Sequence, residues 1–343
     1  MKTKYNLIIS NKNLGIEILR AILCFWVLLF HCLNVKYAQK NIFFYFAKFK
    51  LYHVPCFTFI AFYFSFNIFK NLNLIKIKSR FERLLIPYLV YPIAIWIINN
   101  LIYLAFSFNR FNRIITFYEL FIQLILGYQF SINLWFLLST IIITMIFTLL
   151  VYTLNTYFFY VLQIVGIIFI IFQYSKPLNF FYNYPNNIKI PLNHIISQIP
   201  LSIAGITYAF SDIISNLKNK ENLLFISFIH FLLIFVFFKY NIFKTMNEYK
   251  GIEKIFLSFL LFTGFYLLPL NNFNYKIKLA IKLITNFTQG IYCLHPIIKY
   301  YVHSFLDKNE TFSGSILIYL ISYIISFLAM KIFGKTKLKY LFV

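Results

Sequence analysis

Charged residues are scarce in this sequence. Only 12% of the 343 residues are Asp, Glu, Lys or Arg, whereas 61% are hydrophobic. A soluble domain of this length would carry about twice that share of charge. The composition therefore excludes an ordinary soluble protein and predicts an integral membrane protein.

Acidic residues are the scarcest charged class. Nine Asp and Glu residues stand against 32 Lys and Arg residues, which gives a formal net charge of +23. A nucleic-acid partner would suit that charge, but the lysines are scattered between apolar runs and form no single basic segment. Anionic lipid head groups are the simpler partners for lysines that flank membrane helices. We therefore predict membrane lipids, and no nucleic acid, as partners.

Arginine is also rare, with five residues among the 32 basic ones, at positions 20, 80, 83, 110 and 113. Arginine offers a planar, permanently charged fork that matches phosphate and carboxylate groups, whereas lysine is a point charge. A chain that uses lysine so freely is expected to keep arginine where lysine will not serve. Arg20, Arg80 and Arg83 are therefore candidate ligand-binding residues.

The four cysteines, at positions 24, 32, 56 and 293, form no CxxC motif. Most lie in apolar runs, which predicts small buried side chains and no structural disulfide. No His, Cys and carboxylate cluster has ligand spacing, so we expect no metal. The first apolar stretch lacks the cleavage site of a signal peptide, so we expect it to be the first retained helix.

Long apolar runs occupy most of the chain. A helix of about 20 apolar residues spans a ~30 Å hydrocarbon core, and a helix satisfies its backbone polar groups without water. We predict an all-α integral membrane protein, a single domain over residues 1–343 with about ten transmembrane helices. The expected spans are 16–33, 52–70, 84–105, 132–153, 155–174, 194–213, 222–239, 252–270, 281–300 and 313–333.

Residues 114–130 are apolar but contain Glu119 and Gln123. They predict an interfacial or re-entrant helix, with an eleventh span as the alternative. Ten spans would place both termini on one side. Lys and Arg crowd residues 70–83 and the C-terminal segment, and such residues favour the cytoplasmic side. We therefore expect cytoplasmic N- and C-termini.

Two ionisable side chains, Arg20 and His31, interrupt the first apolar run. They are eleven residues apart, which on an α-helix is within ~20° of three full turns and a rise of ~16.5 Å. Both therefore share one helix face, with Arg20 near a membrane surface and His31 deeper. Ionisable groups in a bilayer are costly and tend to face a protein interior and serve a function. The alternatives are an interfacial anchor for Arg20 and an interhelical hydrogen bond for His31.

Glu17 lies one turn before Arg20, where its carboxylate can hold the guanidinium in place. His31 has the side chain whose unperturbed pKa lies near neutrality, which suits a general base. Arg80 and Arg83 lie three residues apart on one side of a helix. At a helix N-terminus, two guanidiniums would add to the exposed N–H groups to bind an anion such as the phosphates of coenzyme A. The alternative is a basic cluster that fixes topology.

Five segments resemble, in the same order, segments of the acyltransferase-3 family of integral membrane acyltransferases. Glu17, Leu19, Arg20 and His31 match the family's first-helix pattern of an acidic residue, Leu, Arg and a later His. The others resemble the start of its second helix, its RxxR and Pro-Tyr segment, its Leu-Trp-Phe element and its late Tyr-x-Leu-His segment, at His53–Phe57, Lys78–Tyr88, Leu134–Leu137 and Gly290–Pro296.

One position departs from the family pattern. The family often has Ser-Gly midway along the second helix, where this chain has Ala61-Phe62. The local helix contact must therefore differ. The sequence alone favours an aromatic belt at the membrane interface for Trp135 and Phe136, and it leaves the role of His295 open between packing, hydrogen bonding and substrate contact.

The resemblance implies a membrane-bound O-acyltransferase of the polysaccharide or lipopolysaccharide O-acetyltransferase type, in a bacterial inner membrane and without a fused extracytoplasmic domain. Such an enzyme moves an acyl group, with acetyl the first choice, from cytoplasmic acyl-CoA to a hydroxyl of a cell-surface polysaccharide or lipid-linked glycan. Arg80, Arg83 and Arg20 would bind acetyl-CoA. His31 would be the general base, either on the acceptor hydroxyl or on a carrier step that moves the acyl group outward, and Glu17 would orient Arg20.

Three alternatives remain at this point. A transporter or flippase for a lipid-linked sugar also fits ten spans and a basic face, although the chain lacks the internal repeats that such proteins often show. The donor could be another acyl-CoA, for example succinyl-CoA. An inactive family member that assists assembly is disfavoured because Arg20, His31, Arg80 and Arg83 are all present.

Overall fold

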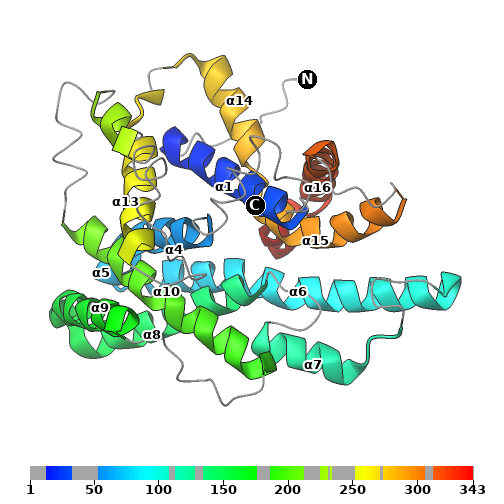
Figure 1. The fold of residues 1–343 in the computed structure, drawn as a ribbon, viewed down its shortest axis with the longest axis horizontal. Helices are drawn as coiled ribbons and strands as arrows, with labels where there is room; N and C mark the ends of the chain where they lie inside the picture. Colours follow the sequence, from blue (N-terminus) through cyan, green and yellow to red (C-terminus); the bar gives the residue numbers. More distant parts are fainter. Residues whose placement is uncertain are drawn as a thin grey trace.

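A computed structural model describes residues 13–32, 53–107, 113–127, 134–175, 186–211, 225–230, 232–233, 252–270, 273–305 and 312–342. These residues form helices and no β-strand (Figure 1), which confirms the all-α fold for the described part of the chain. The α-helices are α1 (Leu14–Cys32), α4 (His53–Tyr63), α5 (Phe66–Lys70), α6 (Leu74–Phe106), α7 (Phe117–Leu126), α8 (Trp135–Leu154), α9 (Phe158–Ser175), α10 (Asn186–Phe210), α13 (Ile252–Leu267), α14 (Tyr275–Thr285), α15 (Thr288–Phe305) and α16 (Phe312–Phe333). Two short 3₁₀ helices are η3 (Asn155–Tyr157) and η5 (Lys337–Leu341).

Helix α1 packs against helices from several parts of the chain. It contacts α4, α13, α14, α15 and α16, and Figure 1 shows α1, α15 and α16 in the same part of the molecule, above the long α6. One hydrophobic cluster joins α1 to α6, α8, α15 and α16, and a second joins it to α4, α10 and α13. Because α1 contributes to both clusters, its side chains are held from several directions.

The first turn of α1 approaches the backbone of α13 closely. A Cβ atom added at Gly15 would overlap the carbonyl oxygen of Phe265. The Asn13 side-chain amide donates to the Tyr266 carbonyl over 2.7 Å. Glycine at position 15 therefore permits the contact that fixes the start of α1.

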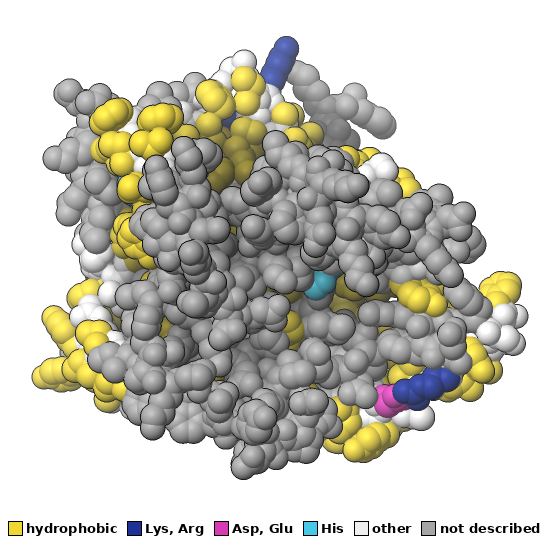
Figure 2. All heavy atoms as spheres, viewed as in Figure 1, with side chains coloured by type: hydrophobic (Ala, Val, Ile, Leu, Met, Phe, Trp, Pro, Cys, Tyr) yellow, Lys and Arg dark blue, Asp and Glu magenta, His cyan; other side chains and the backbone are white. Residues whose placement is uncertain are grey.

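Three helices among the described residues are long and apolar enough to cross a membrane: α6, α8 and the Ser313–Phe333 part of α16. Hydrophobic side chains cover much of the described surface in Figure 2, with few charged ones among them. Both observations suit a membrane protein. The count of ten spans and the side of each terminus stay predictions, and most of the expected 222–239 span lies outside the described residues.

Two expected spans each divide into two helices in the structure, so the prediction of one continuous helix is wrong for both. The 52–70 run divides into α4 and α5 at Phe64 and Ser65, where the Ser65 hydroxyl donates to the Ala61 carbonyl over 2.6 Å and so competes with the helix backbone for that acceptor. The 281–300 run divides at Asn286 and Phe287 into α14 and α15.

Helix α6 starts at Leu74, ten residues before the expected 84. The Asn73 side chain accepts a hydrogen bond from the Lys76 backbone N–H over 3.0 Å and caps the helix. Its 33 residues correspond to about 50 Å, more than the ~30 Å hydrocarbon core requires. The helix therefore extends beyond the apolar span that hydropathy predicts.

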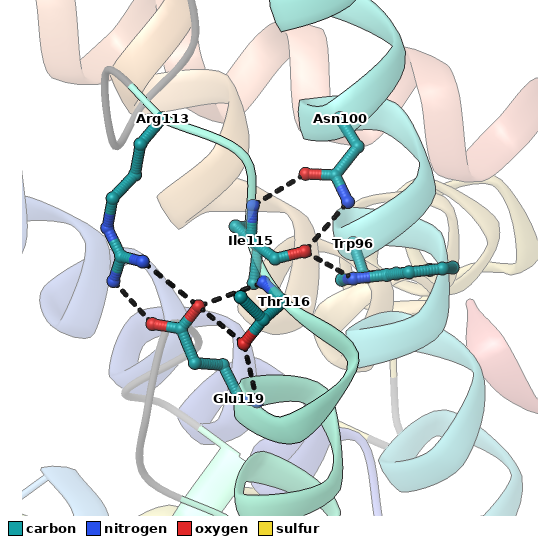
Figure 3. A network of polar contacts seen from close by, with 6 residues as sticks. All are labelled: Trp96, Asn100, Arg113, Ile115, Thr116 and Glu119. Atoms are coloured by element: carbon teal, nitrogen blue, oxygen red, sulfur yellow. Dashed lines mark hydrogen bonds and ion pairs between the residues drawn. The ribbon is translucent and has the colours of Figure 1, made fainter.

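Helix α7 has ten residues, or about 15 Å, which is half the thickness of the hydrocarbon core. It is therefore too short to be an eleventh span, and the interfacial or re-entrant helix is the better interpretation. Figure 3 shows how the segment before α7 is held against α6. The Ile115 N–H donates to the Asn100 side chain over 2.8 Å, and the Ile115 carbonyl accepts from Trp96 and Asn100.

A capping box starts α7. The Glu119 N–H donates to the Thr116 hydroxyl, and the Glu119 carboxylate accepts from the Thr116 N–H. Arg113, whose side chain is 58% exposed, pairs with the same carboxylate (Figure 3). Partial burial acts to raise the pKa of Glu119, but hydrogen bonds from Arg113 and Thr116 outweigh it and hold that pKa below its usual value.

Replacing the cap should loosen α7 without unfolding the protein. For Thr116→Ala we expect a loss of about 1 kcal/mol in the stability of α7, typical of a removed N-cap. Amide hydrogen exchange of residues 117–126 should then accelerate about fivefold, with α8 unchanged as the internal control. Because the pKa of Glu119 is lowered, its part of the stabilisation is present above the ordinary carboxyl pKa and is lost as the pH falls below it. Equal exchange in both proteins would contradict the role of the cap.

Candidate active site

Arg20 is held between its own helix and α15. Its Nη1 lies 3.4 Å from Oε1 and 3.5 Å from Oε2 of Glu17, and its Nη2 donates to the Thr288 hydroxyl over 3.4 Å. The Arg20 side chain is 31% exposed and that of Glu17 is 13% exposed. The pairing expected from their spacing is present, and the guanidinium is positioned while still accessible.

One turn further along α1, Cys24 makes a second contact with the start of α15. Its thiol donates to the Thr288 carbonyl over 3.2 Å. All four cysteines lie within the described residues, and all are buried free thiols. The prediction of no structural disulfide is therefore confirmed. Cys24 acts here as a small packing residue with a weak donor.

His31, in the last turn of α1, lies against the middle of α15. Its ring centroid is 5.5 Å from that of His295, with the rings tilted by 33°. The Lys299 ammonium donates to the His31 backbone carbonyl. Tyr292, His295 and Lys299 are separated by three and four residues and so share one face of α15. Arg20 and His31 therefore contact the same neighbouring helix, as a shared face of α1 requires.

His295 is fully enclosed, with 1% of its surface exposed. Its Nδ1 is 3.2 Å from the Ile291 carbonyl oxygen, a contact in which the ring nitrogen must donate. The Tyr292 ring lies beside it at 6.1 Å. The sequence left the role of His295 open, and the structure assigns it a place beside the His31 ring.

Aromatic side chains close this region from α4 and α8. Phe57, Phe136 and Tyr292 have ring centroids 6.0 to 6.4 Å apart. Trp135 is only 6% exposed, so the aromatic-belt interpretation is wrong for this residue. Tertiary packing at the start of α8 buries a ring that composition alone would place against lipid head groups.

Arg80 points into the helix bundle. Its Nε donates to the Thr144 hydroxyl over 3.2 Å and its Nη1 donates to the Ala61 carbonyl over 3.3 Å. The guanidinium carbon lies 5.0 Å from the centroid of the Phe62 ring, a cation–π distance. The Ala61-Phe62 departure from the family pattern therefore lies in direct contact with Arg80.

Arg83, one turn later, is exposed. The two arginines thus differ, because Arg80 joins α6 to α4 and α8. Of the Arg80 guanidinium nitrogens, Nη2 is the one that is buried without a hydrogen-bond partner among the described residues. Neither lies at a helix N-terminus, because α6 begins six residues before Arg80. The predicted contribution of free backbone N–H groups to an anion site at these arginines is therefore wrong.

The C-terminal basic segment docks beside Arg83. Lys337 forms an ion pair of 2.6 Å with Glu82, and the Tyr91 hydroxyl donates to the Leu341 carbonyl over 2.7 Å. The two basic segments that suggested a cytoplasmic face, 70–83 and the C-terminal one, thus lie together along the first half of α6.

Sequence reasoning missed Thr288 and Lys299. Thr288 follows a helix break that hydropathy did not reveal. Lys299 was visible as one of two lysines in the apolar 281–300 run, four residues after His295, and that spacing was a usable signal. Among the described residues, no three His, Cys, Asp or Glu side chains gather as metal ligands would.

The family model of an acyltransferase domain matches residues 13–333, which include the candidate residues Glu17, Arg20, His31, Arg80, Arg83, Thr288, His295 and Lys299. The chain belongs to the acyltransferase-3 family. The match spans all the described helices from α1 to α16, so the acyltransferase-3 domain accounts for nearly the whole protein. Comparison with curated proteins and with solved structures gives no match. This is therefore a membrane acyltransferase, whose donor and acceptor the comparisons do not specify.

The two arginines of the RxxR segment offer a matched pair for a stability test. Arg80→Lys keeps the charge but loses the fork that reaches both Thr144 and Ala61. We expect it to destabilise the purified protein by about 1–3 kcal/mol, in the range for hydrogen bonds to a charged group. Arg83→Lys changes an exposed side chain and should lie within about 0.5 kcal/mol of the wild type. Thermal unfolding in detergent measures both, and equal midpoints would contradict a structural role for Arg80.

Proposed function

We propose that this acyltransferase-3 protein transfers an acyl group, with acetyl the first choice, from cytoplasmic acyl-CoA to a hydroxyl of a cell-surface polysaccharide or lipid-linked glycan. The observation that carries the proposal is the placement of Arg20 and His31 against one helix, α15. A cationic group for the donor and a base for the acceptor thus lie along a single helix contact.

Arg20 and Arg83 are the residues proposed to bind the phosphates of the donor. Arg20 is partly exposed and Arg83 is exposed, so both can meet an anion. Arginine forks match phosphate oxygens and bind them with two parallel hydrogen bonds. Arg80 has protein acceptors for Nε and Nη1 and its Nη2 is buried, so its proposed part in donor binding is to hold α6 in place beside Arg83. Glu17 keeps the Arg20 guanidinium oriented.

The proposed reaction is an acyl transfer with His31 as general base. The imidazole accepts the proton of the acceptor hydroxyl while that oxygen attacks the thioester carbonyl carbon. The carbon–sulfur bond then breaks, the coenzyme A thiolate leaves, and the imidazolium returns the proton to it. A positioned base contributes about 10²–10⁴-fold to the rate. Lys299 fixes the His31 backbone, and His295 packs beside its ring.

A variant pair tests these roles. With labelled acetyl-CoA and native membranes as the acceptor source, His31→Ala should reduce label transfer at least 100-fold. Arg20→Lys should raise the acetyl-CoA KM about tenfold, because it keeps the charge but loses the fork. His230→Ala is the matched control, since the His230 ring bonds to the Ile226 carbonyl one turn earlier and packs near Phe259, away from the proposed site.

Unchanged transfer in both variants, with the proteins present in the membrane at wild-type level, would remove the proposed mechanism. A wild type that transfers no label from acetyl-CoA but accepts labelled succinyl-CoA would change the donor and keep the enzyme class. A wild type that moves a lipid-linked sugar and transfers no acyl group would instead support the transporter.

A further inference from the structure

The start of α15 holds two arginine-bearing helices at once. Thr288 bonds to α1 through the Arg20 guanidinium and the Cys24 thiol. The next residue, Gln289, bonds to α6: its side-chain Nε2 donates to the Arg83 carbonyl over 3.1 Å. The same Nε2 donates to the Tyr340 carbonyl in the C-terminal segment, also over 3.1 Å. Two consecutive residues thus connect three separate parts of the chain.

The Arg83 carbonyl needs an outside donor because of a proline. In an α-helix the carbonyl of residue 83 would accept from the backbone N–H of residue 87. Residue 87 is Pro87, inside α6, and proline has no N–H. Gln289 supplies the missing donor, so the helical defect becomes the point where α15 attaches to α6.

The second N–H of the amide secures the C-terminal segment in the same place. Tyr340 lies in η5. The carbonyl of the next residue, Leu341, accepts a hydrogen bond from the Tyr91 hydroxyl of α6. A Cβ atom added at Gly290 would overlap the Ser326 hydroxyl and lie 3.0 Å from the Phe342 Cα. The start of α15 is therefore packed tightly against α16 and Phe342.

From these contacts we infer that Thr288 and Gln289 form a clamp that sets the spacing between Arg20 and Arg83, so that both bind one polyanionic donor. Gln289 is a positioning residue, since it touches neither guanidinium and acts through the Arg83 backbone. This inference rests on the proposed function, and it adds Gln289, Pro87 and the C-terminal segment to the determinants of donor affinity.

The clamp predicts a specific kinetic signature. Gln289→Leu keeps the size of the side chain and removes both N–H donors. Because each donor–acceptor pair contributes modestly, we expect the acetyl-CoA KM to rise about tenfold. The turnover number at saturating donor should stay within about twofold, since His31 and its surroundings are untouched. Initial rates of label transfer in native membranes at varied acetyl-CoA concentration measure both quantities.

Two further variants separate positioning from simple folding. Thr285→Val, at the end of α14, removes a hydroxyl that bonds only to the Lys282 carbonyl among the described contacts, and should leave KM unchanged. Gln289→Lys restores a long N–H donor at the same position and should return KM to within about threefold of the wild type. Should Gln289→Leu fail to accumulate, Gln289→Met, which has a similar length, no charge and no N–H donor, replaces it.

A double variant gives the sharpest test. Pro87→Ala restores a backbone N–H at position 87, which satisfies the Arg83 carbonyl inside α6. In the double variant with Gln289→Leu, the Arg83 carbonyl has its helical donor again, but the hydrogen bond between α15 and α6 is still absent. If Gln289 positions Arg83, KM stays raised in the double variant. A KM restored to the wild-type value would overturn the inference, because Gln289 would then serve only to satisfy that carbonyl.

The outcomes distinguish this inference from the proposed function. If the wild type is active and KM is unchanged in every Gln289 variant, the clamp is contradicted and the proposed function is not. A fall in turnover with no change in KM also overturns the clamp, since it would place Gln289 in the chemical step. If the wild type transfers no label from any acyl-CoA, the proposed function is contradicted. The clamp is then contradicted as well, because it rests on that function.

Discussion

The contact between α1 and α15 is the interaction on which the site depends. Arg20 and Cys24 meet Thr288 at one end of this contact, and His31 meets His295 and Lys299 at the other. Glycine at the start of each helix allows close contact with other elements: Gly15 of α1 approaches the α13 backbone, and Gly290 of α15 approaches the Ser326 side chain of α16 and the Phe342 backbone. If either helix rotated, the guanidinium and the imidazole would no longer lie along one helix contact.

The periodicity of the first helix made part of this site predictable. An eleven-residue spacing places Arg20 and His31 on one face, and a three-residue spacing pairs Arg20 with Glu17, because both follow from helix geometry alone. The all-helical fold follows from hydropathy for the same local reason. Helix ends were harder to predict, since the Asn73 cap of α6 and the Ser65 bond at the end of α4 are single polar contacts within apolar runs.

Long-range contacts could not be read from the chain. Arg80 and Arg83 look equivalent in sequence, but Arg80 meets Ala61 and Thr144 from two other helices, whereas Arg83 faces outward. Gln289 carries no signal of its own: its role depends on Pro87, about two hundred residues earlier, which leaves a carbonyl without its helical donor. Such pairings appear only when the fold brings both residues together.

The burial of Cys24, Cys32, Cys56 and Cys293 has a practical consequence for topology. A water-soluble, membrane-impermeant maleimide needs an accessible thiolate, and all four native thiols are enclosed by protein. A single cysteine introduced near either end of the chain would then be labelled from one side of intact cells only. The natural sequence is thus already suited to mapping which face of the membrane each terminus occupies.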